Sequence, residues 1–181
     1  MELESKWGKI FIQRFDSHQN TLQETSFDAV FHENCLASEF YSAFLISVPV
    51  QGLRILLCGS FYAGHDDFAL VDDERLIVLV DTEIFVVDIA TGRLLLHKEL
   101  KVDWQSLWSI YRFGGGYIIH GEIEIVKLNN CFDTEWTFCG GDIWVTLDPA
   151  QKAFEIRGDT LRLHDWNGRY YLLNTAGQEI T

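Results

Sequence analysis

Residues 75–100, RLIVLVDTEIFVVDIATGRLLLHKEL, decide the fold class of this chain. Leu76–Val80 is an apolar run of strand length, and Ile84–Ile89 is a second run that is rich in β-branched residues. Asp88–Arg93 then supplies a turn, because an aspartate can hydrogen-bond the backbone ahead of it and Gly92 can adopt the positive φ that ends a type I turn with a bulge. The stretch therefore predicts two strands, a tight turn and a third strand.

The composition of the whole chain agrees with this prediction. Hydrophobic residues make up 48% of the 181 residues, only two residues are proline, and most of the 14 glycines fall between short apolar runs, where turns need them. A chain of this length can bury a core without disulfides or metals to hold it together. We predict an all-β fold in which residues 1–181 form a single domain of consecutive antiparallel hairpins.

The sequence gives no sign of export or of a membrane. The first six residues, MELESK, lack the basic start and apolar core of a secretory signal, and no apolar run approaches the roughly 18 residues of a membrane helix. We therefore expect a cytoplasmic protein in which the four cysteines (Cys35, Cys58, Cys131, Cys139) are reduced and buried. No CxxC motif is present, and the spacing of cysteine and histidine gives no support for a zinc site, so we expect no cofactor.

Acidic residues dominate the charge. The chain has 27 acidic and 14 basic residues, a net charge of −13 and an isoelectric point near 4.7, and residues 66–74 (DDFALVDDE) contain five acids and no base. This balance disfavours nucleic-acid binding, which requires cations against the phosphates. It permits attraction of a basic partner, although acidity that serves solubility alone is the simpler alternative.

Other segments give less regular patterns. Ser26–Phe40 fits a helix capped by Ser26, or alternatively a strand followed by a loop. Ile143–Leu147 is an apolar run that predicts a strand. Asn167-Gly168 is the sequence of a two-residue hairpin turn between strands 161–166 and 169–174.

A two-residue turn at Asn167-Gly168 would fix the register of that hairpin. It would place Leu163 opposite Leu172 and His164 opposite Tyr171. The core face would then carry four side chains, namely Leu161, Leu163, Tyr170 and Leu172.

Three turns share a further pattern: VVDIATGRL at 86–94, VTLDPAQKAF at 145–154 and LLNTAGQEI at 172–180. They resemble the turns of β-propeller blades of the pyrroloquinoline-quinone and tryptophan–aspartate types, in which a D-x-x-T-G-[KR] turn joins two strands. The resemblance implies propeller-like blades. However, Asp88, Asp148 and Asn174 are 60 and 26 residues apart, whereas blades repeat at intervals of about 40–50 residues. Three or four short blades, an open partial propeller and an irregular meander all remain open.

Two short clusters carry residue types that bind metals or transfer protons. His65-Asp66-Asp67 lies in an expected loop, where a solvated acidic turn is the simpler interpretation. His120-Gly121-Glu122 lies on an expected strand, where His120 and Glu122 would point to the same face, but no further ligand is identifiable. Neither a nucleophile elbow nor a phosphate-binding loop is present.

These observations favour a non-enzymatic protein-binding module with an acidic, aromatic surface. The expected contact residues are Asp66, Asp67, Asp72, Asp73, Glu74, Trp104 and Trp166. In size, charge and lack of catalytic motifs the chain is similar to bacterial immunity proteins, which implies a basic toxin as the partner. The alternative is a small-ligand-binding protein or a metal-dependent enzyme that uses His65, Asp66, His120 and Glu122.

Overall fold

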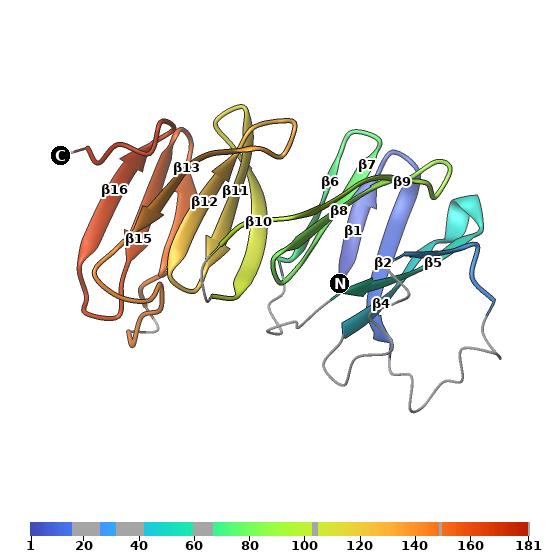
Figure 1. Cartoon of the computed structure of the whole chain (residues 1–181), viewed down its shortest axis with the longest axis horizontal. Coiled ribbons are helices and arrows are strands. Elements are labelled where there is room, and N and C mark those ends of the chain that lie inside the picture. Colours follow the sequence, from blue (N-terminus) through green and yellow to red (C-terminus); the bar gives the residue numbers. More distant parts are fainter. Residues whose placement is uncertain (16–25, 32–41, 60–66, 103–104, 149, 181) are drawn as a thin grey trace. The chain divides into compact units, whose positions relative to one another are not determined.

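The computed structural model describes residues 1–15, 26–31, 42–59, 67–102, 105–148 and 150–180, and the described chain is almost entirely β. It contains four sheets and a single short 3-10 helix, Pro49–Gln51, and no α-helix within the described ranges (Figure 1). The predicted all-β class with antiparallel hairpins is therefore confirmed. The chain divides into two compact units, Met1–Val102 and Asp103–Thr181, and the prediction that they form a single folding domain stays a prediction.

Sheet A of the first unit has the strand order β1-β2-β4-β5-β3. Its strands are β1 (Glu2–Ser5), β2 (Gly8–Phe15), β3 (Ala29–Phe31), β4 (Ser42–Val48) and β5 (Leu53–Gly59). All neighbours pair antiparallel except β3, which runs parallel to β5. Of the two alternatives for Ser26–Phe40, the helix is wrong and the strand is confirmed where the structure describes the segment, because Ala29–Phe31 is a strand whose backbone pairs with Ile55–Leu57. The part from residue 32 onward lies outside the described residues.

Sheet B contains the stretch with which the sequence analysis began. It is a four-stranded antiparallel meander of β6 (Ala69–Asp72), β7 (Arg75–Val80), β8 (Glu83–Asp88) and β9 (Leu94–Glu99). The turn at Asp88 forms as predicted: Asp88 Oδ1 accepts hydrogen bonds from the backbone and the hydroxyl of Thr91 at 2.8 and 2.6 Å, and Gly92 has a φ of +70°. The predicted arrangement of strands and turn in residues 75–100 is thus confirmed.

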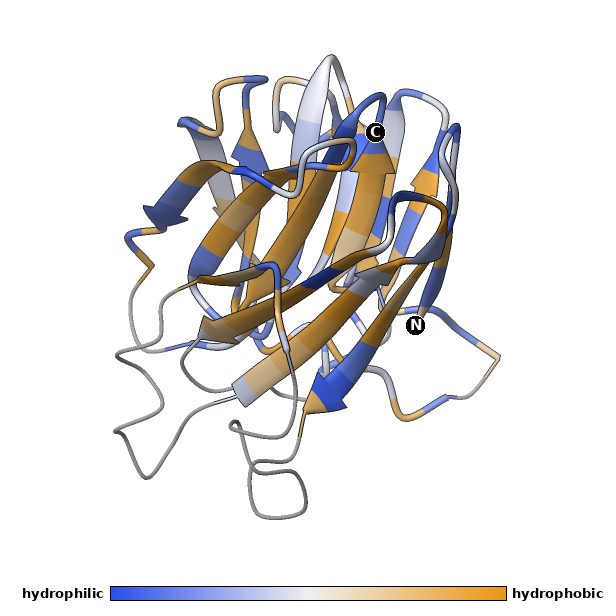
Figure 2. Cartoon of the chain, turned by 90° about the vertical axis from the view of Figure 1, so that its right-hand side faces the viewer, coloured by the Kyte–Doolittle hydropathy of each residue, from blue (hydrophilic) through white to orange (hydrophobic). Residues whose placement is uncertain are grey.

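The core of the first unit lies between sheets A and B. Alternate residues of β2 and β4 in sheet A pack with alternate residues of β7 and β8 in sheet B in one buried cluster. That cluster includes Ile10, Ile12, Phe44, Ile46, Val78 and Phe85. Figure 2 shows hydrophobic residues along the strands and hydrophilic residues at many of the turns.

The second unit contains two further antiparallel sheets. Sheet C is the meander of β10 (Leu107–Phe113), β11 (Gly116–Gly121), β12 (Glu124–Leu128) and β13 (Thr134–Cys139). Sheet D consists of β14 (Phe154–Arg157), β15 (Thr160–His164) and β16 (Tyr170–Asn174). One buried cluster joins the two sheets: Phe113, Ile118 and Ile125 of sheet C, Leu161, Leu163 and Leu173 of sheet D, and Trp144 from the connection between them.

The predicted strand at Ile143–Leu147 is wrong. These residues form an irregular connection whose backbone bonds are isolated. The Trp144 N–H donates to the Glu122 carbonyl at 2.9 Å, the Val145 N–H to the Ile143 carbonyl at 3.0 Å, and the Trp166 N–H to the Ile143 carbonyl at 2.9 Å. The apolar character of the segment has another cause. Trp144 is fully buried and fills the space between sheets C and D, so the run is apolar because it supplies core and not because it pairs.

The predicted register of the last hairpin is also wrong, by one residue. Leu163 pairs with Tyr171 and His164 pairs with Tyr170, because the loop is a five-residue turn from Asp165 to Arg169. The Gly168 N–H bonds to the Asp165 carbonyl at 2.9 Å, and Gly168 adopts a φ of +75°, which is the geometry of a type I turn followed by a bulge.

Consequently the core face of β16 carries Tyr171 and Leu173, whereas Tyr170 is 49% exposed and Leu172 is only partly buried.

The cysteine prediction holds only in part. Cys58 is a buried thiol, as expected, but the thiols of Cys131 and Cys139 are exposed, and none of the three forms a disulfide. Cys139 ends an edge strand whose side chains alternate between the two faces, and its position falls on the solvent side. Cys35 lies outside the described residues. Within the described ranges the chain has no helix that is long and apolar enough to span a membrane.

Candidate functional site

The acidic segment predicted from residues 66–74 ends in the tight turn that joins β6 to β7. Asp72 and Arg75 are cross-strand partners at its base, and their side chains form an ion pair at 2.5 Å. Asp73 and Glu74 form the tip and are exposed, and Asp73 holds a left-handed φ of +54°, a conformation that aspartate tolerates better than most residues. Since Asp72 is only 8% exposed and is paired, the accessible charge of the β6–β7 turn belongs to its tip.

A recess of about 600 Å³ opens beside this tip. It is lined by Lys6, Asp73, Glu74, Arg75, Asp88 and Leu95, and we call it the acidic recess. These residues come from the turn after β1, the β6–β7 turn, the end of β8, and β9. All of them belong to the first unit.

Asp88 contributes a fixed negative charge to the acidic recess. The hydrogen bond from the Thr91 hydroxyl is the largest cause that lowers the pKa of Asp88, and the N–H groups of Thr91 and Ala90 and the charge of Arg93 lower it further, against a smaller opposing effect of burial. Asp88 is therefore ionised throughout the neutral range. Together with Asp73, Glu74 and Asp72 it gives four anionic groups against the two cations Lys6 and Arg75.

Lys6 is the more loosely held of those two cations. It forms an ion pair with Glu74, and both side chains are more than half exposed. Exposed pairs of this kind contribute only about 0–1 kcal/mol, so a cation of a binding partner can replace Lys6 at little cost. Leu95 lines the same recess and is 54% exposed, which offers apolar contact next to the charges.

The structure brings only some of the predicted contact residues together. Asp73 and Glu74 line the acidic recess, and Asp67 is exposed just before β6. Trp166 is 44% exposed but belongs to the second unit, at the tip of the β15–β16 turn. Asp66 and Trp104 lie outside the described residues.

Sequence reasoning missed Lys6, Asp88 and Leu95 as neighbours of the acidic tip. The sequence did contain a signal for Asp88. Pairing of β7 and β8 in a hairpin places Asp88 opposite Arg75, at the end of the hairpin where the β6–β7 turn also lies.

The described structure gives no added support to the alternative of a metal or acid–base site at His120 and Glu122. His120 is packed against aromatic rings: it stacks on Phe154 with centroids 4.7 Å apart, and Trp108 meets it edge-on at 5.1 Å. Among the described residues no group of three histidine, cysteine, aspartate or glutamate side chains is placed to hold a metal ion. His65 lies outside the described ranges, so that half of the alternative stays a prediction.

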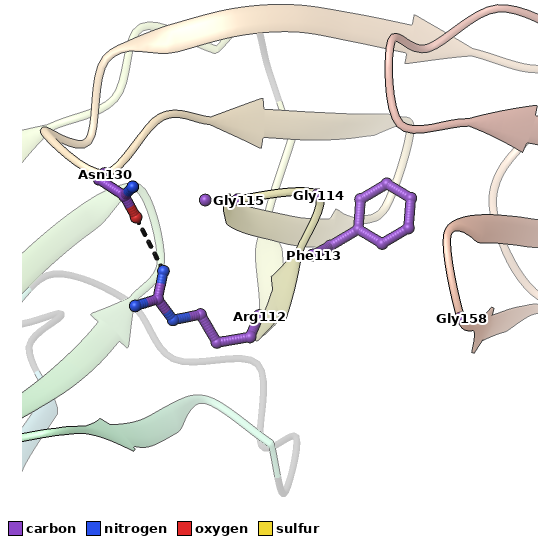
Figure 3. Close-up of a pocket in the computed structure, with 7 residues that line it drawn as sticks. Arg112, Phe113, Gly114, Gly115, Asn130 and Gly158 are labelled. Atoms are coloured by element: carbon purple, nitrogen blue, oxygen red, sulfur yellow. Dashed lines mark hydrogen bonds between the residues drawn. The ribbon is translucent and has the colours of Figure 1, made fainter.

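A recess of about 580 Å³ in the second unit surrounds the glycine-rich turn between β10 and β11 (Figure 3). Among the described residues that line it, Arg112 alone is charged, and the guanidinium donates to Asn130 Oδ1 at 2.8 Å and lies 4.5 Å from the centroid of the Tyr117 ring. The cation is thus engaged within the protein. We do not assign a ligand to this recess.

Comparison with known proteins leaves the family open. No protein-family model and no curated protein matches the chain. Among solved structures it is similar to BamB from Moraxella catarrhalis, with 15% identity over 80% of this chain and 47% of BamB and a TM-score of 0.49. It is also similar to a loop-replaced KlHsv2 (9% identity, 76% of this chain and 44% of that one, TM-score 0.45) and to a Bacteroides caccae protein of unknown function (15%, 77% and 58%, TM-score 0.41).

The chain spans about half the length of these structures. All three TM-scores lie below 0.5, so our description of the architecture rests on the strand order and the packing given above.

Proposed function

We propose that this chain is a protein-binding module whose acidic recess receives a basic side chain of a partner protein. The observation that carries the proposal is the recess itself: Asp73, Glu74 and Asp88 line it together with a cation, Lys6, whose ion pair with Glu74 is exposed and whose ammonium lies 5.1 Å from the centroid of the Trp7 ring. A partner lysine or arginine would take the place of Lys6, and Leu95 would pack against the apolar stem of the incoming side chain. The net charge of −13 would attract such a partner from a distance.

The test compares two variants with the same change in charge. Asp73→Asn/Glu74→Gln removes two charges from the acidic recess, and Asp159→Asn/Glu179→Gln removes two exposed charges from the second unit. Each tagged protein is used to capture partners at low and high salt, and the captured protein is then purified and titrated against all three by calorimetry. We expect a basic partner whose affinity falls at least about tenfold with the recess variant and with salt, but little with the control.

Equal affinity of the two variants, or a partner whose affinity does not change with salt concentration, would contradict the proposal.

A more specific form of the proposal makes the chain a bacterial immunity protein that neutralises a basic toxin. This form rests on the sign and amount of the chain's net charge. For that form the captured partner must lose a measurable toxic or enzymatic activity on addition of the wild-type chain and keep it with the recess variant.

We further propose that the meander sheets are blades of a partial β-propeller. The support is that sheets B and C are four-stranded antiparallel meanders in which consecutive strands are neighbours, which is the construction of a propeller blade. The blade-like turn at Asp88 also joins the last two strands of sheet B. A crystal structure would test this proposal through the arrangement of the sheets around a common axis.

A further inference from the structure

Sheet D presents a basic face although the chain as a whole is acidic. Side chains along its strands alternate, so that Phe154, Ile156, Leu161 and Leu163 face the core of the second unit. The residues between them face the other way, and they are mostly charged or polar. This face is made of Glu155 and Arg157 on β14, Arg162 and His164 on β15, and Tyr170 on β16.

These side chains line a recess of about 290 Å³, which also includes Lys152 from the turn before β14. Arg157 is bound to Glu155 through two hydrogen bonds, from Nε at 2.8 Å and from Nη2 at 3.2 Å. Arg162 lies directly across the strand pair from Glu155. His164 and Tyr170 are cross-strand partners with ring centroids 5.1 Å apart, and they form another part of the wall.

Positive charge is in excess in this recess. Lys152, Arg157 and Arg162 face a single acid, Glu155, which Arg157 already engages on both oxygens. The hydrogen bond from Arg157 is the largest cause that lowers the pKa of Glu155, and the charges of Arg157, Arg162 and Lys152 lower it further, against a smaller effect of burial. The four groups therefore act on one another across the recess, and among the described residues that line it Lys152 and Arg162 have no carboxylate of their own.

Arg162 has a donor group that no described residue satisfies. Its Nε is buried from solvent and has no hydrogen-bond partner among the described residues. A buried donor without an acceptor is unfavourable. Because the Nε has almost no accessible surface, a ligand would reach it only when the Arg162 side chain changes its rotamer, and the guanidinium then presents its N–H groups in the fork that matches phosphate or carboxylate oxygens. Lys152 adds a second cation, and the Tyr170 hydroxyl and the His164 ring are further groups that can donate to an oxygen.

We propose that this recess binds a small molecule through an oxyanion, either a phosphate monoester or a carboxylate, with Arg162 as the principal donor. The volume suits a small polar metabolite, since it lies just below the range for pockets that hold drug-sized ligands. The site belongs to the second unit and uses no residue of the acidic recess, so this proposal does not depend on the proposed protein partner.

The test uses three probes on the full chain in dilute salt: inorganic phosphate, glycerol 3-phosphate and succinate. Binding is followed by calorimetry and by amide chemical shifts in ¹H–¹⁵N spectra. The variant is Arg162→Gln, and the control is Lys101→Gln, which removes one positive charge from an exposed position in the other unit. Circular dichroism establishes that both variants are folded.

We expect saturable binding of at least one probe, shifts centred on Arg162, His164 and Tyr170, and affinity at least about tenfold lower in Arg162→Gln but unchanged in the control. Preference for the two phosphates over succinate would identify a phosphate site, and the reverse a carboxylate site. The proposal is overturned if no probe binds up to about 10 mM, or if Arg162→Gln binds as well as wild type. In case that variant does not fold, the shift map of the wild type decides: shifts elsewhere in the chain overturn the proposal.

Discussion

Asp165 holds together one end of the second unit, and its replacement should have a large effect on stability. The side chain is 1% exposed and accepts hydrogen bonds from the Arg169 N–H at 2.9 Å, the Tyr171 hydroxyl at 2.9 Å and the Gly141 N–H at 3.2 Å. Asp165→Asn keeps the shape but turns one acceptor oxygen into an NH₂ group that faces a donor. Because bonds to a charged group contribute about 1.5–3 kcal/mol each, we expect a loss of about 3 kcal/mol in the free energy of unfolding at pH 7.

Urea unfolding followed by tryptophan fluorescence measures this loss. With a slope of about 2 kcal/mol per molar urea, the midpoint should fall by about 1.5 M while the slope stays the same. Asp159→Asn is the matched control: Asp159 is exposed in the β14–β15 turn, and its replacement should change the free energy by less than about 0.5 kcal/mol.

The effect should also depend on pH. Burial raises the pKa of Asp165, but the bonds from Arg169, Tyr171 and Gly141 and the charge of Arg169 outweigh it, so the pKa lies below its ordinary value of 3.8. A lowered pKa gives stability that is present above the unfolded value and lost as the pH falls through the folded one. The difference between wild type and Asp165→Asn should therefore be full at pH 7 and shrink below about pH 4. A difference under about 0.5 kcal/mol at pH 7, or one that does not shrink in acid, would refute this account.

Three further predictions concern the core and the cooperativity of the chain. Lys127 is 1% exposed and donates to the Leu128 carbonyl and to Glu135, both at 2.9 Å. Lys127→Met should lower the free energy of unfolding by less than about 1.5 kcal/mol, whereas Glu135→Ala should lower it by more, because it leaves the buried ammonium without its carboxylate. Urea titration of the two variants checks this order. Gly116→Ala would place a Cβ 2.1 Å from the Leu128 carbonyl oxygen, and we expect a loss of about 3 kcal/mol, visible as a lower melting temperature. If residues 1–181 form one folding domain, calorimetry should show a single two-state transition that Asp165→Asn shifts as a whole, whereas two transitions of which only one shifts would contradict that prediction.

The strands around residues 75–100 could be predicted because several local signals agree there. β7 and β8 are apolar runs of strand length, and the Asp88 turn has the residues that its geometry needs. At Ile143–Leu147 the same reasoning failed, since an apolar run shows that a segment is buried but not that it finds a strand to pair with. Trp144 fills the core from an irregular connection, and nothing in its own sequence distinguishes that from a strand.

The candidate site could be predicted only where its residues are close in sequence. The acidic tip at Asp73 and Glu74 was recognised from residues 66–74. Lys6 and Leu95 lie 67 and 22 residues away from Asp73 in the sequence. They line the recess because Lys6 follows the end of β1, Leu95 lies in β9, and both come close to the β6–β7 turn in the folded chain. A contact of this kind depends on strand order, which the hydrophobic pattern of a single strand does not contain.

The hairpin register connects the error in the fold prediction with the site that the prediction missed. A two-residue turn at Asn167-Gly168 would have turned Tyr170 toward the core. The carboxylate of Asp165 instead accepts the Arg169 N–H, and the bulge at Gly168 adds one residue to the loop. Because side chains alternate with a period of two, that single residue moves every side chain of β16 to the opposite face. Tyr171 thereby reaches Asp165 from the core side, and Tyr170 joins His164 at the wall of the basic recess, so the aspartate that stabilises the turn also determines which tyrosine faces the proposed ligand.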